Sequence, residues 1–389
     1  MTALAPAPAP RYISLKFFYF CFYGALGAYF PFLQLYYRDV GLDVAQIGLL
    51  ATLGGLIGLL AGPLWTIIAD AFRLHRVMLP LCFGLNLGML FLIGQTPSFA
   101  GLVLVVGLNA FLSAPVGPLA DSGVVLALGE RRELYGAQRL WGSVSWAVST
   151  VVAGALVTQF GVWVIFPIVV GLGVPAVIMS ARLPRAPLIQ PDLRAGARQL
   201  LRDQGWLLFI LSAFLLGCCL VAATGYATSF IRDIGGTGEV VGAAFAIGAL
   251  AEIPVMGLTA RIIRRFGARR VLLVACLLYA LCAIVQSVLT DPWAVAASQV
   301  LRGVSYGLFW TAGVLEAQAL APRGMNATAQ SLFGAATTSL PNLAFTTPAG
   351  LIYRDFGHAW LFRIGALLGL GAAAGMAAVR ERAAKPPAA

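Results

Sequence analysis

Apolar residues run along this chain in long blocks, and short polar stretches separate one block from the next. A helix that crosses a membrane needs about 20 mostly apolar residues. The sequence contains twelve blocks of this kind and therefore predicts twelve membrane-spanning helices. The predicted spans cover residues 13–37, 45–69, 77–95, 99–128, 135–157, 162–181, 205–230, 239–260, 270–289, 293–319, 325–352 and 357–379.

The composition supports an all-α membrane protein. Hydrophobic residues make up 60% of the chain and charged residues only 11%, whereas a soluble domain carries about 25% charged residues. So few charges cannot cover a soluble surface. The net charge of +11 gathers between the apolar blocks, a distribution that serves membrane topology, so we expect no nucleic-acid partner.

The longest polar stretch, residues 182–204, divides the spans into two groups of six. We predict six-helix bundles over 13–181 and 205–379, a cytoplasmic linker between them, a disordered tail over 1–12 and a cytoplasmic tail over 380–389. A weak repeat follows the second span of each group, "GPLWTIIADAFRLHRVML" and "GLTARIIRRFGARRVLLV". Two related halves predict a pseudo-symmetric 6+6 transporter architecture with a central site.

Lysine and arginine lie mostly in the loops on one side of the predicted spans. Because cytoplasmic loops carry the excess of basic residues, both termini are predicted to lie in the cytoplasm of a plasma (inner) membrane protein. The opposite side holds only a few basic residues: Arg38, Arg232, Arg354 and Arg363.

Several motifs resemble the major facilitator superfamily. In "GPLWTIIADAFRLHR", Asp70, Arg73 and Arg76 stand where that family places a gating acid and its basic neighbours, although Thr66 replaces the family's glycine and Arg264 replaces the acid of the second copy. The segments "GAYFPFLQLYYRD", "LSAPVGPLADSG", "YGAQRLWGSVSW" and "GALAEIPVMG" resemble the branch that holds the lactose and phenylpropionate permeases. The resemblance implies the fold and the branch but not the substrate.

Charged residues inside a bilayer mark functional sites by default. In the fourth span Asp121 ends a polar stripe that begins at Asn109, and in the fifth span Arg139 shares a face with Trp146. Asp121 and Arg139 lie at similar depths and could form an ion pair; alternatively, Arg139 anchors the cytoplasmic edge of its span. The resemblance assigns substrate binding to Arg139 and stacking on the substrate to Trp146.

The second half carries its own interior charges, Glu252 and Arg302, and Tyr306 lies on the stripe of Arg302. Arg302 is expected to pair with Glu252 or with the solute, and a purely structural pair is the alternative. The proton-coupling histidine and glutamate of the lactose permease correspond to Arg302 and Ser305, so Glu252 or Asp121 is predicted to carry the proton.

Tyr23 of the first span is expected to stack on a ring of the solute, with ordinary core packing as the alternative. The six cysteines lack metal-ligand spacing, and no nucleotide or HExxH motif occurs. We therefore expect no metal, no cofactor, no catalytic residue and no enzymatic activity.

The sequence as a whole predicts a monomeric secondary active transporter of a small polar or anionic solute, an aromatic acid or a sugar-like molecule. Its partners would be the solute, the lipid bilayer and protons, and the transport would be proton symport by alternating access. The alternatives are a drug or metabolite efflux antiporter, and a non-transporting assembly or receptor protein on the same fold.

Overall fold

The computed structural model describes residues 12–72, 77–129, 134–184, 203–321 and 326–379, and it is helical throughout these ranges, without strands. The first half contains α1 (Tyr12–Tyr29), α2 (Leu33–Asp39), α3 (Val44–Phe72), α4 (Met78–Ile93), α5 (Phe99–Ser113), α6 (Val116–Leu128), α7 (Tyr135–Phe160) and α8 (Ile165–Ser180). The second half contains α10 (Gln204–Leu220), α11 (Ala227–Asp233), α12 (Gly238–Phe266), α13 (Ala268–Gln286), α14 (Pro292–Leu320), α15 (Asn326–Gly334), α16 (Leu340–Phe356) and α17 (His358–Ala378).

These helices form twelve rods, because short turns join some of them end to end. A 3₁₀ turn (Phe30–Phe32) joins α1 to α2, a two-residue turn at 114–115 joins α5 to α6, and π-helical turns (Val221–Gly225 and Ala335–Ser339) join α10 to α11 and α15 to α16. Each predicted span coincides with one rod, and the largest difference lies at the end of the eighth, predicted at 260 and observed at Phe266. In the described ranges, 9 helical stretches are long and apolar enough to cross a membrane.

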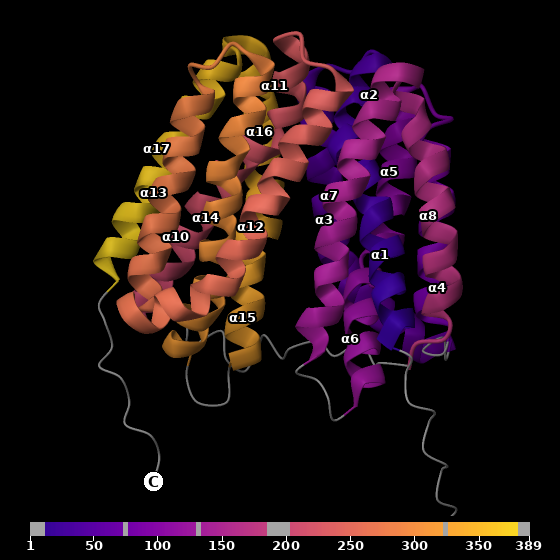
Figure 1. Ribbon diagram of the computed structural model, residues 1–389, viewed down its shortest axis with the longest axis horizontal. Helices are drawn as coiled ribbons and strands as arrows, with labels where there is room; N and C mark the ends of the chain where they lie inside the picture. Colours follow the sequence, from indigo (N-terminus) through magenta and orange to yellow (C-terminus); the bar gives the residue numbers. More distant parts are fainter. Residues whose placement is uncertain (1–11, 73–76, 130–133, 185–202, 322–325, 380–389) are drawn as a thin grey trace, which may run out of the picture.

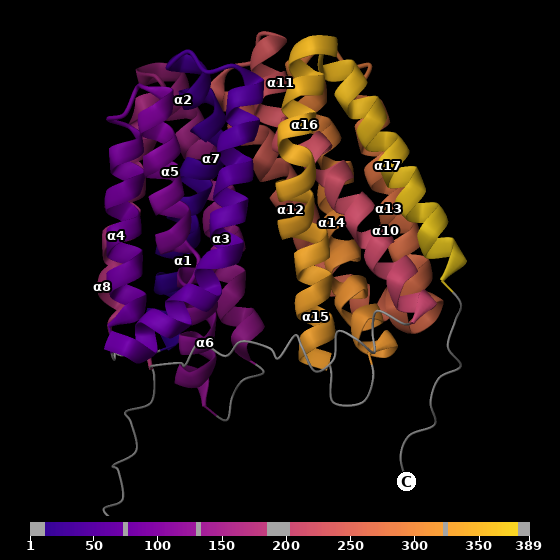
Figure 2. The same cartoon turned by 180° about the vertical axis from the view of Figure 1, so that it is seen from behind.

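The rods form two bundles, α1–α8 and α10–α17, which stand side by side (Figures 1 and 2). The bundles meet through three pairs of helices, α3 with α16, α7 with α12 and α2 with α11. Their ribbons converge at the end of the molecule where α2, α11 and α16 terminate, which we call the closed end, and diverge toward α6 and α15 (Figure 1). The predicted 6+6 arrangement is confirmed.

Glycines bring the two bundles into backbone contact near the closed end. A Cβ atom built on Gly242 of α12 would lie 2.3 Å from the carbonyl oxygen of Thr150 in α7, and one on Gly350 of α16 would lie 2.6 Å from the carbonyl oxygen of Val44 in α3. Small residues at helix crossings allow this close approach in membrane proteins. At these two crossings the helices therefore leave no room for a solute between them.

The fourth rod departs from the sequence-based expectation. The polar stripe from Asn109 to Asp121 assumed one regular helix, but α5 ends at Ser113 and α6 begins at Val116. Pro115 lies at the break, and proline cannot donate the backbone hydrogen bond that would continue the helix. Pro254, in contrast, lies inside α12 without ending it.

Candidate functional site

Arg139, in the second turn of α7, lies over the aromatic residues of α1. Its guanidinium carbon is 3.6 Å from the ring centroid of Tyr23 and 6.0 Å from that of Tyr19. The space for this arrangement comes from Gly142, where a Cβ atom would lie 2.5 Å from Tyr23 Cδ2 and 2.8 Å from Arg139 Nη1. A cation held on an aromatic face in this way is stabilised by the quadrupole of the ring. The Arg139 side chain therefore points toward α1.

Asp121, in α6, is linked to Arg139 through an intermediate residue. The hydroxyl of Tyr19 donates a hydrogen bond of 2.8 Å to Asp121 Oδ1. Within the part of the chain that the structure describes, no ion pair joins Asp121 to Arg139. In place of the direct ion pair considered from the sequence, the Asp121 carboxylate contacts the Tyr19 phenol, whose ring faces the Arg139 guanidinium. Tyr19 is fully buried and was not among the predicted site residues.

Arg302 occupies the second bundle, where it lies across the backbone of α12. A Cβ atom on Gly248 would lie only 1.7 Å from Arg302 Nη2, so no other residue type fits beneath this guanidinium in its present position. Arg302 Nε donates to Gln299 Oε1 at 2.8 Å. The other end of that amide, Gln299 Nε2, is buried and has no hydrogen-bond partner among the residues that the structure describes. Arg302 and Gln299 therefore offer more hydrogen-bond donors than the acceptor that Gln299 Oε1 provides.

Glu252 lies one helical turn from Gly248 on α12, within electrostatic reach of Arg302 and also of Arg139 from the other bundle. The expected ion pair between Glu252 and Arg302 is not formed among the described residues, since no such pair falls within 4.0 Å. Tyr306 stacks on Trp310, with ring centroids 6.1 Å apart. The charges of Glu252, Arg302 and Arg139 act on its hydroxyl. Charged groups of both bundles therefore act on Glu252 and Tyr306.

The remaining predicted residues are scattered around this centre. Trp146 lies toward Phe30, at a centroid distance of 6.4 Å. Asn109 accepts a hydrogen bond of 2.8 Å from Asn86, so its side chain already has a protein partner. Of the predicted gating residues, Asp70 falls in the last turn of α3 but its side chain lies outside the described part of the chain. Arg73 and Arg76 lie outside the described residues altogether.

A cavity of about 270 Å³ opens beside Tyr23, inside the first bundle. Its wall is mostly aromatic and aliphatic, with Asn86 and Ser113 as the polar side chains. Tyr23 thus has the Arg139 guanidinium over its ring and also lines an apolar cavity.

Two six-helix bundles with interior charges that meet across their interface are the architecture of a secondary transporter. The chain belongs to the MFS_1 like family, whose model matches residues 12–364. It is 33% identical over 365 residues to a maltose permease of Geobacillus stearothermophilus, covering 91% of each chain. It is 28% identical over 374 residues to a probable 3-phenylpropionic acid transporter of Escherichia coli (strain K12), covering 90% of this chain and 93% of the relative.

The fold also matches that of solved transporters. The structure of the nucleoside transporter NupG superposes with a TM-score of 0.81 over 95% of this chain and 98% of that one, at 17% sequence identity. At this identity the likeness establishes the fold alone. The predicted membership of the major facilitator superfamily is confirmed by the family model and by the permease relatives.

Proposed function

We propose that this transporter is a proton symporter for a small aromatic carboxylate, which it carries across the plasma membrane with the closed end facing outward. The observation that carries the proposal is that two arginines from opposite bundles, Arg139 and Arg302, both act electrostatically on one carboxylate, Glu252. Because the bundles diverge away from the closed end (Figure 1), the site is proposed to open to the cytoplasm in this conformation.

The charges of the centre favour an anion over a neutral sugar. Asp121 is hydrogen-bonded by the hydroxyl of Tyr19, and among the described residues no carboxylate lies within 4.0 Å of Arg139 or Arg302. A guanidinium without a carboxylate in direct contact is free to donate charge-assisted hydrogen bonds to one that the solute brings. A solute carboxylate would supply this direct partner. Of the solutes named for the relatives, maltose and 3-phenylpropionic acid, only the acid brings that charge.

The cavity beside Tyr23 supports an aromatic group on the solute. An apolar cavity of about 150 Å³ in another protein accommodates benzene, so 270 Å³ accommodates a phenyl ring with space for a short chain. Since Tyr23 both lines the cavity and lies beneath the Arg139 guanidinium, a ring held there would place a carboxylate on a two- or three-carbon chain near Arg139.

Glu252 is the proposed proton carrier. A solute carboxylate that binds Arg139 and Arg302 weakens their attraction for the Glu252 carboxylate. A carboxylate left without compensating charges away from water is stable only in its protonated form. Binding of the anion and uptake of a proton at Glu252 would therefore favour each other, which is the linkage that symport requires.

Uptake into proteoliposomes tests the proposal. Radiolabelled 3-phenylpropionate should accumulate when the lumen is made alkaline, and unlabelled benzoate-type acids should compete while maltose should not. Arg139→Gln should abolish accumulation. The matched control is Arg363→Gln in α17, an exposed arginine that lies over Trp360, 5.6 Å from its ring centroid, and it should transport normally. Uptake of maltose with no response to the acid would refute the substrate class, and unaltered uptake by Arg139→Gln would refute the site.

A further inference from the structure

A short motif, Arg-Asp followed by an apolar residue and glycine, occurs three times in the chain, at 38–41, 232–235 and 354–357. Each copy ends a helix at the closed end: the first ends α2, the second α11 and the third α16. The three glycines, Gly41, Gly235 and Gly357, have φ values of +90°, +88° and +86°. Glycine adopts this backbone conformation without strain and commonly ends helices, so the same sequence builds the same helix end three times.

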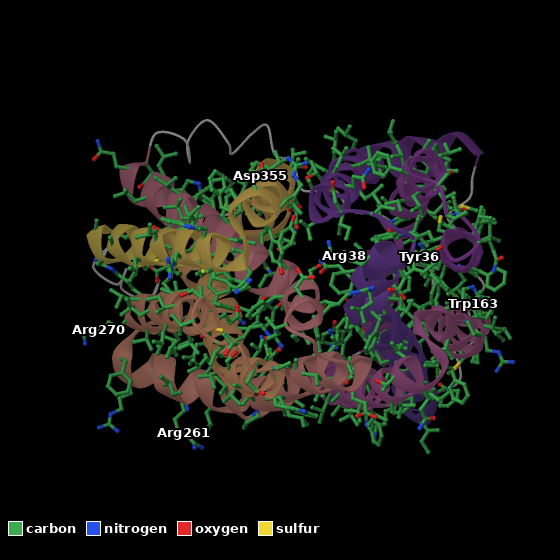
Figure 3. The ribbon with its side chains drawn as sticks, turned by 90° about the horizontal axis from the view of Figure 1, so that it is seen from above. Tyr36, Arg38, Trp163, Arg261, Arg270 and Asp355 are labelled. Atoms are coloured by element: carbon green, nitrogen blue, oxygen red, sulfur yellow. The ribbon has the colours of Figure 1, made fainter. Side chains whose placement is uncertain are left out.

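The first two copies are joined by reciprocal ion pairs across the two bundles. Arg38 Nη2 lies 2.7 Å from Asp233 Oδ1, and Arg232 Nη2 lies 2.5 Å from Asp39 Oδ1. Each arginine therefore binds the aspartate of the other copy, as a two-fold relation between the copies requires. Figure 3 shows Arg38 near the middle of the closed end, between the bundles.

The third copy shows a different pairing. Arg354 binds its own neighbour, with Nε 2.7 Å from Asp355 Oδ1, and lies 4.0 Å from Asp43 of the first bundle. Asp355 lies near the end of α16 and therefore at the closed end, as Arg38 does (Figure 1). An Arg-Asp dipeptide at such a helix end thus has two ways to satisfy its charges: it pairs internally, as at 354–355, or it exchanges partners with a second copy.

We propose that the copies at 38–41 and 232–235 form a partner-exchanging latch that holds the closed end shut. Opening separates α2 from α11 and breaks both reciprocal pairs. Each arginine then binds the aspartate next to it, in the arrangement that Arg354 and Asp355 already adopt, so no charge is left without a partner. The latch opposes opening only by the difference in free energy between the exchanged ion pairs and the internal ones. The closed end is therefore held shut but can still open.

Distance measurement across the closed end tests the latch. Nitroxide labels at Phe160→Cys and Val288→Cys report on the two bundles, because both positions lie at this end and are 70% and 67% exposed. The six native cysteines are buried, so the introduced ones are labelled selectively. Arg38→Asp places like charges opposite each other at Asp233, and we expect the ratio of long to short distances to rise about tenfold, equivalent to about 1.4 kcal/mol. Arg363→Asp is the control, since it makes the same charge change away from the latch, and it should leave the distances unchanged.

The charge-swapped double variant Arg38→Asp/Asp233→Arg distinguishes partner exchange from a static pair. The swap preserves the ion pairs between the copies but puts two aspartates side by side at 38–39 and two arginines at 232–233, so internal pairing is lost. We expect the short distance to dominate more than in the unmodified protein and uptake of 3-phenylpropionate to slow. Raising the salt concentration from about 0.05 M to about 1 M should increase the population of the long distance more in the double variant than in the unmodified protein, because in the unmodified protein salt weakens the ion pairs of both states.

Several results would overturn the latch. One is a distance distribution for Arg38→Asp that matches that of Arg363→Asp, and another is a double variant that stays as open as Arg38→Asp alone. A double variant with both the distances and the uptake of the unmodified protein would contradict partner exchange. A double variant whose distance distribution does not respond to salt would refute the ionic origin of closure.

Discussion

Replacement of Gly142 by alanine is expected to weaken solute binding, because the added methyl group falls where Tyr23 and Arg139 meet. The new Cβ atom would lie 2.5 Å from Tyr23 Cδ2 and 2.8 Å from Arg139 Nη1. Carbon atoms in contact are separated by about 3.5 Å or more, so the ring must move by about 1 Å. The guanidinium is flexible, but the ring is held edge-on by Phe22, at a centroid distance of 4.9 Å. Arg139 therefore loses the ring that orients it.

The size of the effect follows from the interactions lost. A cation–π contact away from water contributes about 2 kcal/mol, which corresponds to an increase of about 30-fold in the KM of the solute. Helix propensity acts in the opposite direction, since alanine is favoured over glycine in a helix by about 1 kcal/mol. We therefore expect Gly142→Ala to lose affinity for the solute but to remain folded.

Initial rates of 3-phenylpropionate uptake in proteoliposomes, together with the thermal unfolding temperature, check this prediction. The matched control is Gly171→Ala in α8, where a Cβ atom would meet nothing within 4 Å. A KM for Gly142→Ala equal to that of the control, in a protein that unfolds at the same temperature, would show that Tyr23 does not orient Arg139 for binding.

Three further substitutions probe other parts of the site. Glu252→Gln should abolish accumulation driven by a pH gradient but preserve exchange of labelled for unlabelled acid, and accumulation that persists would assign the proton to another group. Gly248→Ala should displace the Arg302 guanidinium, whose Nη2 atom lies 1.7 Å from the new Cβ. The loss of a charged hydrogen bond to the solute should raise KM about tenfold or more in the uptake assay. An unchanged KM would exclude Arg302 from binding. Ser113→Leu fills the cavity beside Tyr23 and should lower the affinity for 3-phenylpropionate but not the affinity for propionate, as measured by competition, whereas equal losses for both acids would argue against a ring in the cavity.

The helices were largely predictable from the sequence because each one is a local property. A span in lipid must satisfy its backbone hydrogen bonds internally, so a sufficiently long apolar block forms a helix whatever its neighbours are. The end of α12 shows where this reasoning falls short. The predicted span stops at 260, but the helix continues to Phe266, because the basic residues near its end extend a helix beyond the apolar block that predicts it.

The interior charges were identified from the sequence, but their partners were not. Arg139, Asp121, Glu252 and Arg302 are conspicuous because charges are rare within spans. The sequence suggested two direct ion pairs, and the structure instead provides Tyr19 as the partner of Asp121 and Gln299 as the partner of Arg302. Partner choice depends on how adjacent helices are rotated and how deeply they sit, and neither can be read from the spacing along one helix.

The sequence alone determined the class of this protein, its twelve spans, its division into two halves and the few charged residues that the lipid would otherwise exclude, because each of these follows from composition and from order along the chain. Only the tertiary structure decided which residues meet: that Tyr23 lies under Arg139, that Gly248 lies under Arg302, and that three Arg-Asp motifs gather at one end and pair in two different ways. The physical reason is that these contacts join residues on different helices. Their distances depend on the packing of the two bundles, which no single segment encodes.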